Sequence, residues 1–355
     1  MKRIEFHDRE KEKKEIMDIL DSEPSLITFV YGPINSGKTT LIDHLIGQLP
    51  DEYAPFYVNL RGRFITGYED FLNVLFEIDE GGVIDNVSEY AQSMIKDLNI
   101  LSGIPIPLHL FEQIFEKKDK SKDMFKYIER FFTEMSKKRV PVLIIDELQV
   151  IGDMKINGLL IYKLFNFFIR LTKEKHLAHV FVVTSDSLFI EQVYSEAMLE
   201  GRSEYLLVDD FDENTTTEFL KGHDFTDDEA RVAWKYCGGK PVCLLKLIRV
   251  DEKELIAKKM LATRVNQLKN LLDYLDYTKP RIMIGEDSYM VEKEDIVNIL
   301  NRFVDAECID DEGLDRPAKH FLVKDNILFL DPDIGIIKPQ SQLNLLAIRE
   351  VMGIA

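Results

Sequence analysis

The chain carries the stretch LITFVYGPINSGKTT at residues 26–40. Its first six residues are apolar or β-branched, which is typical of a strand buried on both faces of a sheet. Two glycines, Gly32 and Gly37, then bracket a short loop that ends on a lysine and two threonines. A strand, a glycine-rich loop and a following helix in this order match the P-loop pattern, in which the loop backbone surrounds phosphate groups.

The spacing within this loop has a chemical explanation. Gly32 and Gly37 permit backbone angles that turn successive N–H groups inward, and the next helix points its positive end at the same place. We expect Lys38 to reach the β- and γ-phosphates of a nucleotide and the Thr39 hydroxyl to be a ligand of Mg²⁺. The other predicted nucleotide contacts come from the loop and the residue after it: Pro33, Ile34, Asn35, Ser36 and Thr40.

A second apolar run, residues 142–145, ends on the carboxylates Asp146 and Glu147. In a parallel sheet the carboxyl ends of the strands meet at one edge, where nucleotides bind. We expect Asp146 to hold Mg²⁺ and Glu147 to orient and polarise the attacking water, which phosphoryl transfer requires. The alternative is an ordinary strand end with a solvated acidic cap.

Polar groups also follow the next two predicted strands. Thr184, with Ser185 as second choice, is placed to sense the γ-phosphate or the attacking water, whereas a helix N-cap suits Ser185 better than Thr184. Arg202 precedes the last strand and is a candidate arginine finger, in its own subunit or a neighbouring one. The alternative for Arg202 is a surface ion pair with an adjacent glutamate.

The order of the predicted elements indicates an α/β fold. Strands are predicted at residues 26–31, 55–60, 141–146, 179–184 and 205–208, and helical stripes alternate with them at residues 8–20, 39–49 and within 62–138. Strands that alternate with helices predict a parallel sheet with helices on both faces. We expect a P-loop α/β domain over residues 1–209.

The rest of the chain has a different pattern. Residues 210–250 read as a helical lid that is interrupted at Gly238-Gly239-Lys240-Pro241. Residues 251–355 combine helical stripes with a β-ribbon expected at 321–323 and 327–330, which indicates a winged-helix-like domain. His320, just before this ribbon, is interpreted as a surface residue, because the seven histidines show no metal-ligand spacing.

Together these motifs resemble those of the archaeal ATPase family, which belongs to the AAA+/STAND group of P-loop proteins. The resemblance rests on the opening Phe6-His7-Asp8-Arg9-Glu10, the P-loop, the acidic strand end and Gly239-Lys240-Pro241. It implies that Asp8 and Arg9 help to seat the base of the nucleotide and that Pro241 contacts the nucleotide from the lid. Family P-loops usually carry Arg and Thr or Ser before the second glycine, whereas Ile34, Asn35 and Ser36 stand here.

Composition limits the partners and the location of the protein. The 355 residues include 45 Lys and Arg against 63 Asp and Glu, a net charge of −18, which argues against broad binding to a polyanion. The amino terminus is charged where a signal peptide is apolar, and no run approaches the length that spans a bilayer. We therefore expect a cytoplasmic protein without a membrane partner.

Three functional hypotheses follow from the sequence. The first is an ATPase that binds ATP or ADP with Mg²⁺ and changes conformation on hydrolysis, with slow turnover until a protein partner or self-association stimulates it. The second is a nucleic-acid-binding initiator or loader that acts through the winged-helix-like domain, although residues 251–355 hold 14 Lys and Arg against 20 Asp and Glu. The third is a scaffold that holds nucleotide without hydrolysing it.

Overall fold

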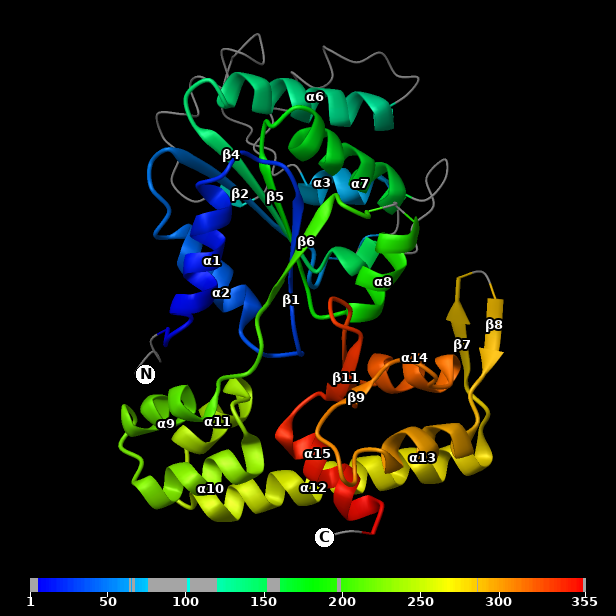
Figure 1. Ribbon diagram of the computed structural model, residues 1–355. Coiled ribbons are helices and arrows are strands. Elements are labelled where there is room, and N and C mark those ends of the chain that lie inside the picture. Colours follow the sequence, from blue (N-terminus) through cyan, green and yellow to red (C-terminus); the bar gives the residue numbers. More distant parts are fainter. Residues whose placement is uncertain are drawn as a thin grey trace.

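The computed structural model describes residues 6–63, 65, 68–75, 101–102, 120–151, 160–196, 199–285 and 287–353. Its α/β part lies above a second part made of helices and two small sheets (Figure 1). The element that decides this arrangement is a six-stranded parallel sheet in the order β3-β2-β4-β5-β1-β6. Its strands are β1 (Ile27–Tyr31), β2 (Tyr53–Asn59), β3 (Leu101–Ser102), β4 (Val140–Asp146), β5 (His179–Thr184) and β6 (Ser203–Leu207).

Helices cover both faces of this sheet, as the unbroken apolar strands predict. Successive strand residues face opposite sides, so Val30 packs on one face with the helices α1 and α2, whereas Phe29 packs on the other face with α3, α6, α7 and α8. The bounds are α1 (Glu10–Leu20), α2 (Lys38–Ile46), α3 (Tyr68–Leu75), α6 (Lys120–Met135), α7 (Leu160–Ile169) and α8 (Ser187–Glu196). A 3₁₀ turn (Leu148–Ile151) follows β4, and a π-helical turn (Arg170–Glu174) extends α7.

The strand order creates a crevice at the carboxyl edge of the sheet. β5 lies between β1 and β4, and all three strands run in the same direction. The loop after β1, the carboxylates after β4 and the polar residues after β5 therefore share one edge. Ligands of open α/β sheets bind at this kind of position.

Three short helices follow the sheet: α9 (Glu213–Lys221), α10 (Asp227–Cys237) and α11 (Pro241–Ile248). Asp212 and Thr226 cap α9 and α10 with their side chains, and a proline at the first helical position begins α11. The predicted helix break at Gly238-Gly239-Lys240-Pro241 is thereby confirmed.

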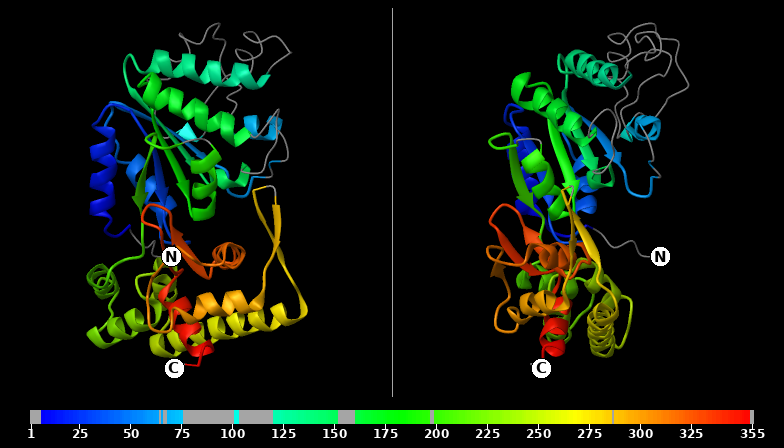
Figure 2. Two further views of the ribbon diagram at one scale, coloured as in Figure 1. Left: turned by 45° about the vertical axis from the view of Figure 1, so that its right-hand side comes forward. Right: turned by 90° about the vertical axis from the view of Figure 1, so that its right-hand side faces the viewer.

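The carboxyl-terminal part mixes helices with short antiparallel strands. Its helices are α12 (Lys253–Tyr277), α13 (Lys293–Asn301), α14 (Arg316–Lys324) and α15 (Gln342–Val351). β7 (Arg281–Ile284) and β8 (Asp287–Met290) form a hairpin that projects from the α12–α13 layer towards the α/β part (Figures 1 and 2). β9 (Ile309–Asp310), β10 (Leu328–Asp331) and β11 (Ile336–Pro339) form a sheet in the order β10-β11-β9.

Three expectations need comment. The ribbon predicted at residues 321–323 and 327–330 is wrong in its first strand, because residues 321–323 lie in α14 and the ribbon pairs β10 with β11. Asp315 caps α14 and Pro317 follows at its start, so the short apolar run continues a helix.

The winged-helix arrangement stays a prediction. Much of the helical segment expected within 62–138 falls outside the described residues.

Among the described residues, every helix is too short or too polar to cross a lipid bilayer.

Candidate functional site

The loop after β1 has the backbone geometry that the sequence predicts. Gly32 and Gly37 have φ angles of 152° and 99°, and Asn35 between them has a φ of 61°. A Cβ atom at Gly32 would lie 2.2 Å from the carbonyl oxygen of Val208, so only glycine fits beside the exit of β6. α2 begins directly after Gly37, which places its unpaired N–H groups at the loop.

Lys38 lies inside this loop rather than in solvent. Its side chain is 7% exposed, and its Nζ donates to the carbonyl oxygens of Gly32 at 3.0 Å and Pro33 at 2.9 Å. Burial and, to a smaller extent, the nearby charge of Lys240 lower the pKa of this ammonium to about 8, against the opposing effect of Glu147 and Asp146. The buried cation has only uncharged hydrogen-bond partners in the described residues, two carbonyls and the Ser36 hydroxyl at 3.5 Å, and is suited to an incoming anion.

Asp146, at the end of β4, lies opposite the start of α2. Its Oδ2 accepts hydrogen bonds from the Thr39 hydroxyl at 2.8 Å and from the Tyr57 hydroxyl at 3.0 Å. Burial raises the pKa of this carboxyl, while those two hydrogen bonds lower it. A hydroxyl and a carboxylate at this separation provide the oxygen ligands that Mg²⁺ prefers, so the residues present fit the metal that the fold implies.

Glu147 follows Asp146 with a left-handed backbone, at a φ of 63°. Its N–H donates to the carbonyl oxygen of Val183 at 2.9 Å, which fixes it between β4 and β5. One carboxylate oxygen forms an ion pair with Arg61, and the other accepts from Gln149 Nε2 at 2.6 Å. Both oxygens of the Glu147 carboxylate are therefore held by neighbouring side chains.

Thr184 reaches this carboxylate through Gln149. The Thr184 hydroxyl donates to Gln149 Oε1 at 2.9 Å, and the N–H of Asp186 donates to the same hydroxyl at 3.0 Å. Sequence reasoning missed Gln149, which lies two residues after Glu147, and Arg61, which follows β2. The available signal was that both are long polar residues just beyond the ends of neighbouring strands.

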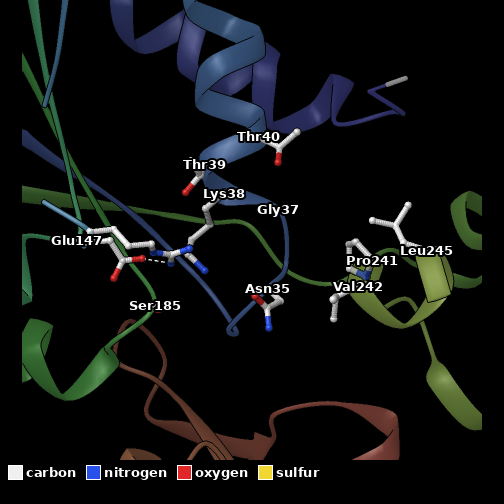
Figure 3. Close-up of a pocket in the computed structure, with 11 residues that line it drawn as sticks. Asn35, Gly37, Lys38, Thr39, Thr40, Glu147, Ser185, Pro241, Val242 and Leu245 are labelled. Atoms are coloured by element: carbon white, nitrogen blue, oxygen red, sulfur yellow. Dashed lines mark hydrogen bonds and ion pairs between the residues drawn. The ribbon is translucent and has the colours of Figure 1, made fainter. Parts of the chain in front are cut away.

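Lys38, Glu147 and Arg61 border one cavity, whereas Asp146 and Gln149 are not among its lining residues (Figure 3). Glu147 and Ser185 lie on one side of the P-loop, and Pro241, Val242 and Leu245 of α11 lie on the other. The structure thus brings together predicted residues from the P-loop, the acidic strand end and the helices after the sheet. Ser185 lines the cavity, and the side chain of Thr184 acts behind it through Gln149. The remaining lining residues are Asn35, Gly37, Thr39 and Thr40.

Asp8 and Arg9 lie beside the P-loop and do not line this cavity. Arg9 Nη2 donates to the carbonyl oxygen of Ser36 at 2.7 Å, and its guanidinium lies 4.6 Å from the ring centroid of Phe211. Asp8 accepts from the Thr215 hydroxyl at 3.0 Å. The pair fastens the amino-terminal segment to the loop and to α9, and its role towards a base stays a prediction.

Arg202 lies at the opposite edge of the sheet from the cavity. It precedes β6, and its carbonyl oxygen accepts the N–H of Ile27, the first residue of β1. The whole length of β1, roughly 15 Å, therefore separates it from the P-loop. A finger in its own subunit is wrong, because a strand's amino end cannot serve the site at its carboxyl end.

Two further segments touch the P-loop from distant parts of the chain. Lys240 Nζ donates to the carbonyl oxygen of Ile34 at 3.0 Å and forms an ion pair with Asp210 at 2.9 Å. The N–H of Ile34 donates to Gln340 Oε1 at 3.1 Å, although 306 residues separate the two. Both backbone polar groups of Ile34 are thus held by residues outside the sheet, which the sequence alone did not indicate.

Comparison with known proteins places this site in a family. Residues 6–247 match a family model described as an ATPase domain predominantly from Archaea, and the chain belongs to that family. Residues 254–352 match a second model, described as the C-terminal domain of MJ1010-like uncharacterized ATP-binding proteins.

Similar proteins extend over the whole chain. An uncharacterized ATP-binding protein of Pyrococcus abyssi is 48% identical over 349 residues, which cover 98% of both chains. One from Methanocaldococcus jannaschii is 47% identical over 365 residues, again 98% of each. A solved structure, the Walker-type ATPase PABY2304 of Pyrococcus abyssi, is similar with a TM-score of 0.59 and 15% identity, covering 97% of this chain and 96% of that one. This last likeness shows the fold.

Proposed function

We propose that the protein binds ATP with Mg²⁺, hydrolyses it, and changes conformation between the bound and free states. The observation that carries this proposal is the cavity where the P-loop, Glu147 and Pro241 of α11 meet. The names of the relatives, which are ATP-binding proteins, favour ATP as the ligand. The sequence also lacks an Asn-Lys-x-Asp segment, the motif that would recognise a guanine base.

Different residues of the site bind the phosphates, hold the metal and activate the water. The N–H groups of the loop and the start of α2 bind phosphate oxygens, and Lys38 exchanges its carbonyl partners for them. Thr39 and Asp146 would hold Mg²⁺, which supplies positive charge to the phosphate oxygens when it is bound. Glu147 accepts the proton of the attacking water, and Gln149 with Thr184 keeps its carboxylate in place.

The conformational part of the proposal rests on the two contacts at Ile34. Lys240 precedes α11, and Gln340 follows β11, so the backbone of Ile34 joins the P-loop to both later parts of the chain. We assign residues 1–209 to the ATPase domain, 210–250 to a helical lid and 251–355 to the carboxyl-terminal domain. Phosphate that draws the loop N–H groups inward competes with the contact to Gln340.

Calorimetry with ATP and Mg²⁺, followed by a turnover assay, tests the proposal. Lys38→Ala should abolish binding, whereas Glu147→Gln should keep binding and lose turnover by about 100-fold or more. Lys137→Ala, on an exposed side chain, is the matched control. Absence of binding to the folded wild-type protein would sink the whole proposal, and binding without turnover would leave the scaffold hypothesis.

A further inference from the structure

A second cavity lies between α8 of the α/β part and the carboxyl-terminal elements α14 and β7. Its apolar walls include Leu188 and Phe189 from α8, Ile282 from β7 and Phe321 from α14. It also reaches Gln149, the residue that holds Glu147 on the side of the nucleotide site. The cavity is therefore separate from the nucleotide site but shares one side chain with it.

The charged groups of this cavity are unequally paired. Asp186 accepts the N–H of Phe189 at 3.1 Å, and Glu191 lies 3.8 Å from the ammonium of Lys319, whereas the carboxylate of Asp325 has no hydrogen bond or ion pair in the described residues. The side chains of Arg316 and Lys324, both exposed on α14, make no hydrogen bond or ion pair within the described residues. The cavity thus presents unpaired positive charge to an anionic ligand.

His320 adds a buried polar atom to the same wall. Its side chain is 9% exposed, and its Nε2 has no hydrogen-bond partner among the described residues. Burial, together with Lys319, Arg316 and Lys324, lowers the pKa of this imidazole to about 4, so the ring is neutral at physiological pH. A neutral imidazole pairs well with a peptide group. The sequence-based interpretation of His320 as a surface residue is wrong.

The third wall is the edge of a two-stranded sheet. All four residues of β7 line the cavity and no residue of β8 does, so the cavity lies along the edge of β7 that faces away from its partner. In the part of the chain that the structure describes, β7 pairs with β8 alone. An unpaired strand edge offers a row of N–H and C=O groups that accepts another extended chain.

We propose that this cavity binds an extended, acidic segment of a partner protein, which adds a strand to the free edge of β7. Its carboxylates meet Arg316 and Lys324, and alternate apolar side chains enter between Phe189 and Phe321. Because Gln149 borders the bound segment and holds both Glu147 and Thr184, occupancy changes ATP turnover. This second clause rests on the proposed function, and the binding clause does not.

Binding is tested without nucleotide, on the full chain, by fluorescence anisotropy. The probe is a labelled heptapeptide that alternates Glu or Asp with Val, and the control peptide has Lys at every acidic position. We expect the acidic probe alone to bind, with an affinity that falls as salt rises. Arg316→Glu with Lys324→Glu should weaken binding by about tenfold or more. The control Lys14→Glu with Lys269→Glu, on exposed lysines that make no ion pair in the described residues, should change it less than twofold.

Strand addition is tested by N-methylating alternate peptide bonds of the probe in the two possible registers. Only one register should lose binding, because an added strand directs every second N–H towards β7. Circular dichroism confirms that the charge-reversed protein is folded, and Arg316→Gln with Lys324→Gln replaces it if it is not. The proposal is overturned if the Lys peptide binds as well, if both methylated probes bind unchanged, or if a single-stranded oligonucleotide displaces the probe more effectively than the unlabelled peptide.

The regulatory clause is tested by ATP turnover at saturating peptide. Peptide should change the turnover of the wild-type protein at least about threefold, and this ratio should approach one in Gln149→Ala, where the shared side chain is gone. Peptide binding without any ATP turnover would refute the proposed function and leave the peptide site intact. Turnover that ignores bound peptide would refute the regulatory clause.

Discussion

The charged ammonium of Lys38 is buried in the P-loop. This burial determines how replacing Lys38 changes the free energy of unfolding. Its pKa is about 8 when folded against 10.5 in an exposed chain, so the unfolded state binds more protons between these values and stability rises with pH there. Below pH 8 the buried ammonium costs stability. Lys38→Met should therefore raise the free energy of unfolding of the nucleotide-free protein at pH 7, by about 1–3 kcal/mol.

Urea unfolding of Lys38→Met and of the exposed control Lys137→Met measures this effect. The control should move the free energy of unfolding by less than about 0.5 kcal/mol. A Lys38→Met protein less stable than the wild type at pH 7 would contradict the burial argument.

The same pKa predicts how nucleotide affinity depends on pH. Phosphate oxygens favour the charged form of Lys38, so ATP affinity should be steady below pH 8 and fall as the pH rises above it. An arginine in this place stays charged across the range, so Lys38→Arg, if it binds ATP, should show a flatter profile. Calorimetry between pH 7 and pH 9.5 compares the two proteins, and parallel profiles would argue against a role for Lys38 ionisation.

Gln149 illustrates a residue that acts through its neighbours. Gln149→Ala removes the hydrogen bonds to Glu147 and Thr184 but leaves the P-loop untouched. We expect turnover to fall by about tenfold while ATP affinity stays within twofold, because the lost contact orients the base and does not bind phosphate. Gln48→Ala, on an exposed glutamine after α2, is the control. Equal loss of affinity and turnover would show that Gln149 mainly supports the fold.

At the scale of elements, the joint between α10 and α11 positions the lid wall of the nucleotide cavity. A Cβ atom at Gly239 would lie 1.7 Å from the carbonyl oxygen of Phe211, whose own N–H donates to the carbonyl oxygen of Gly239 at 3.0 Å. Gly239→Ala should push α11 and Pro241 away from the P-loop. We expect a loss of stability of about 2 kcal/mol or more and weaker ATP binding.

Gly47→Ala is the matched control for this joint. Gly47 has a φ of −68°, and its added Cβ would lie 3.6 Å from the nearest backbone oxygen, so alanine fits. Thermal unfolding and ATP titration of both variants measure the difference. A Gly239→Ala protein that binds ATP like the wild type would show that α11 is not needed at the cavity.

The strands that the sequence predicted most clearly are those buried on both sides. β1, β4 and β5 each hold four or more apolar residues, because a covered parallel strand has no polar face. β2 and β6 are partly exposed, and their apolar runs were still long enough to indicate strands. The hairpin of β7 and β8 escaped prediction because β8 is exposed along its length and shows no alternation. The run at residues 321–323 is too short to separate helix from strand, and the cap at Asp315 decided it.

The candidate site divides in the same way. Lys38, Thr39, Asp146 and Glu147 follow from local order, since each directly follows a predicted strand or loop at the shared edge. Gln340 approaches the P-loop only because the carboxyl-terminal sheet packs beneath it, and no local pattern carries that information. Arg202 was wrongly assigned to the nucleotide site of its own subunit. It precedes β6, so it lies at the amino edge of the sheet, whereas the P-loop lies at the carboxyl edge.

At the scale of the whole molecule, the carboxyl-terminal sheet contacts the ends of β1 and β6 of the α/β part. The Tyr31 hydroxyl donates to Asp331 at 2.7 Å, and Phe329 packs in the core of the α/β part. Lys338 forms an ion pair with Asp209, just beyond β6. These contacts lie around the strand that leads into the P-loop, so we expect a change in the loop to affect β10 and β11.

Gln340 is the point at which this coupling can be broken without touching the nucleotide cavity. Its side chain is 4% exposed, and its amide joins the N–H of Ile34 to the carbonyl oxygen of Leu328. Gln340→Ala leaves both partners buried without it, which should cost about 1–3 kcal/mol of stability. The control Gln342→Ala removes only an exposed contact to Lys235, 3.5 Å long.

Hydrogen exchange with and without an unhydrolysed ATP analogue reads the coupling directly. In the wild-type protein and in Gln342→Ala, the analogue should change the exchange of the amides in β10 and β11, because phosphate and Gln340 compete for the same loop peptide. In Gln340→Ala that difference should shrink while the loop amides still respond. If β10 and β11 respond equally in all three proteins, the signal passes through Tyr31 and Asp331 instead, and the double variant Tyr31→Phe with Asp331→Asn should then abolish it.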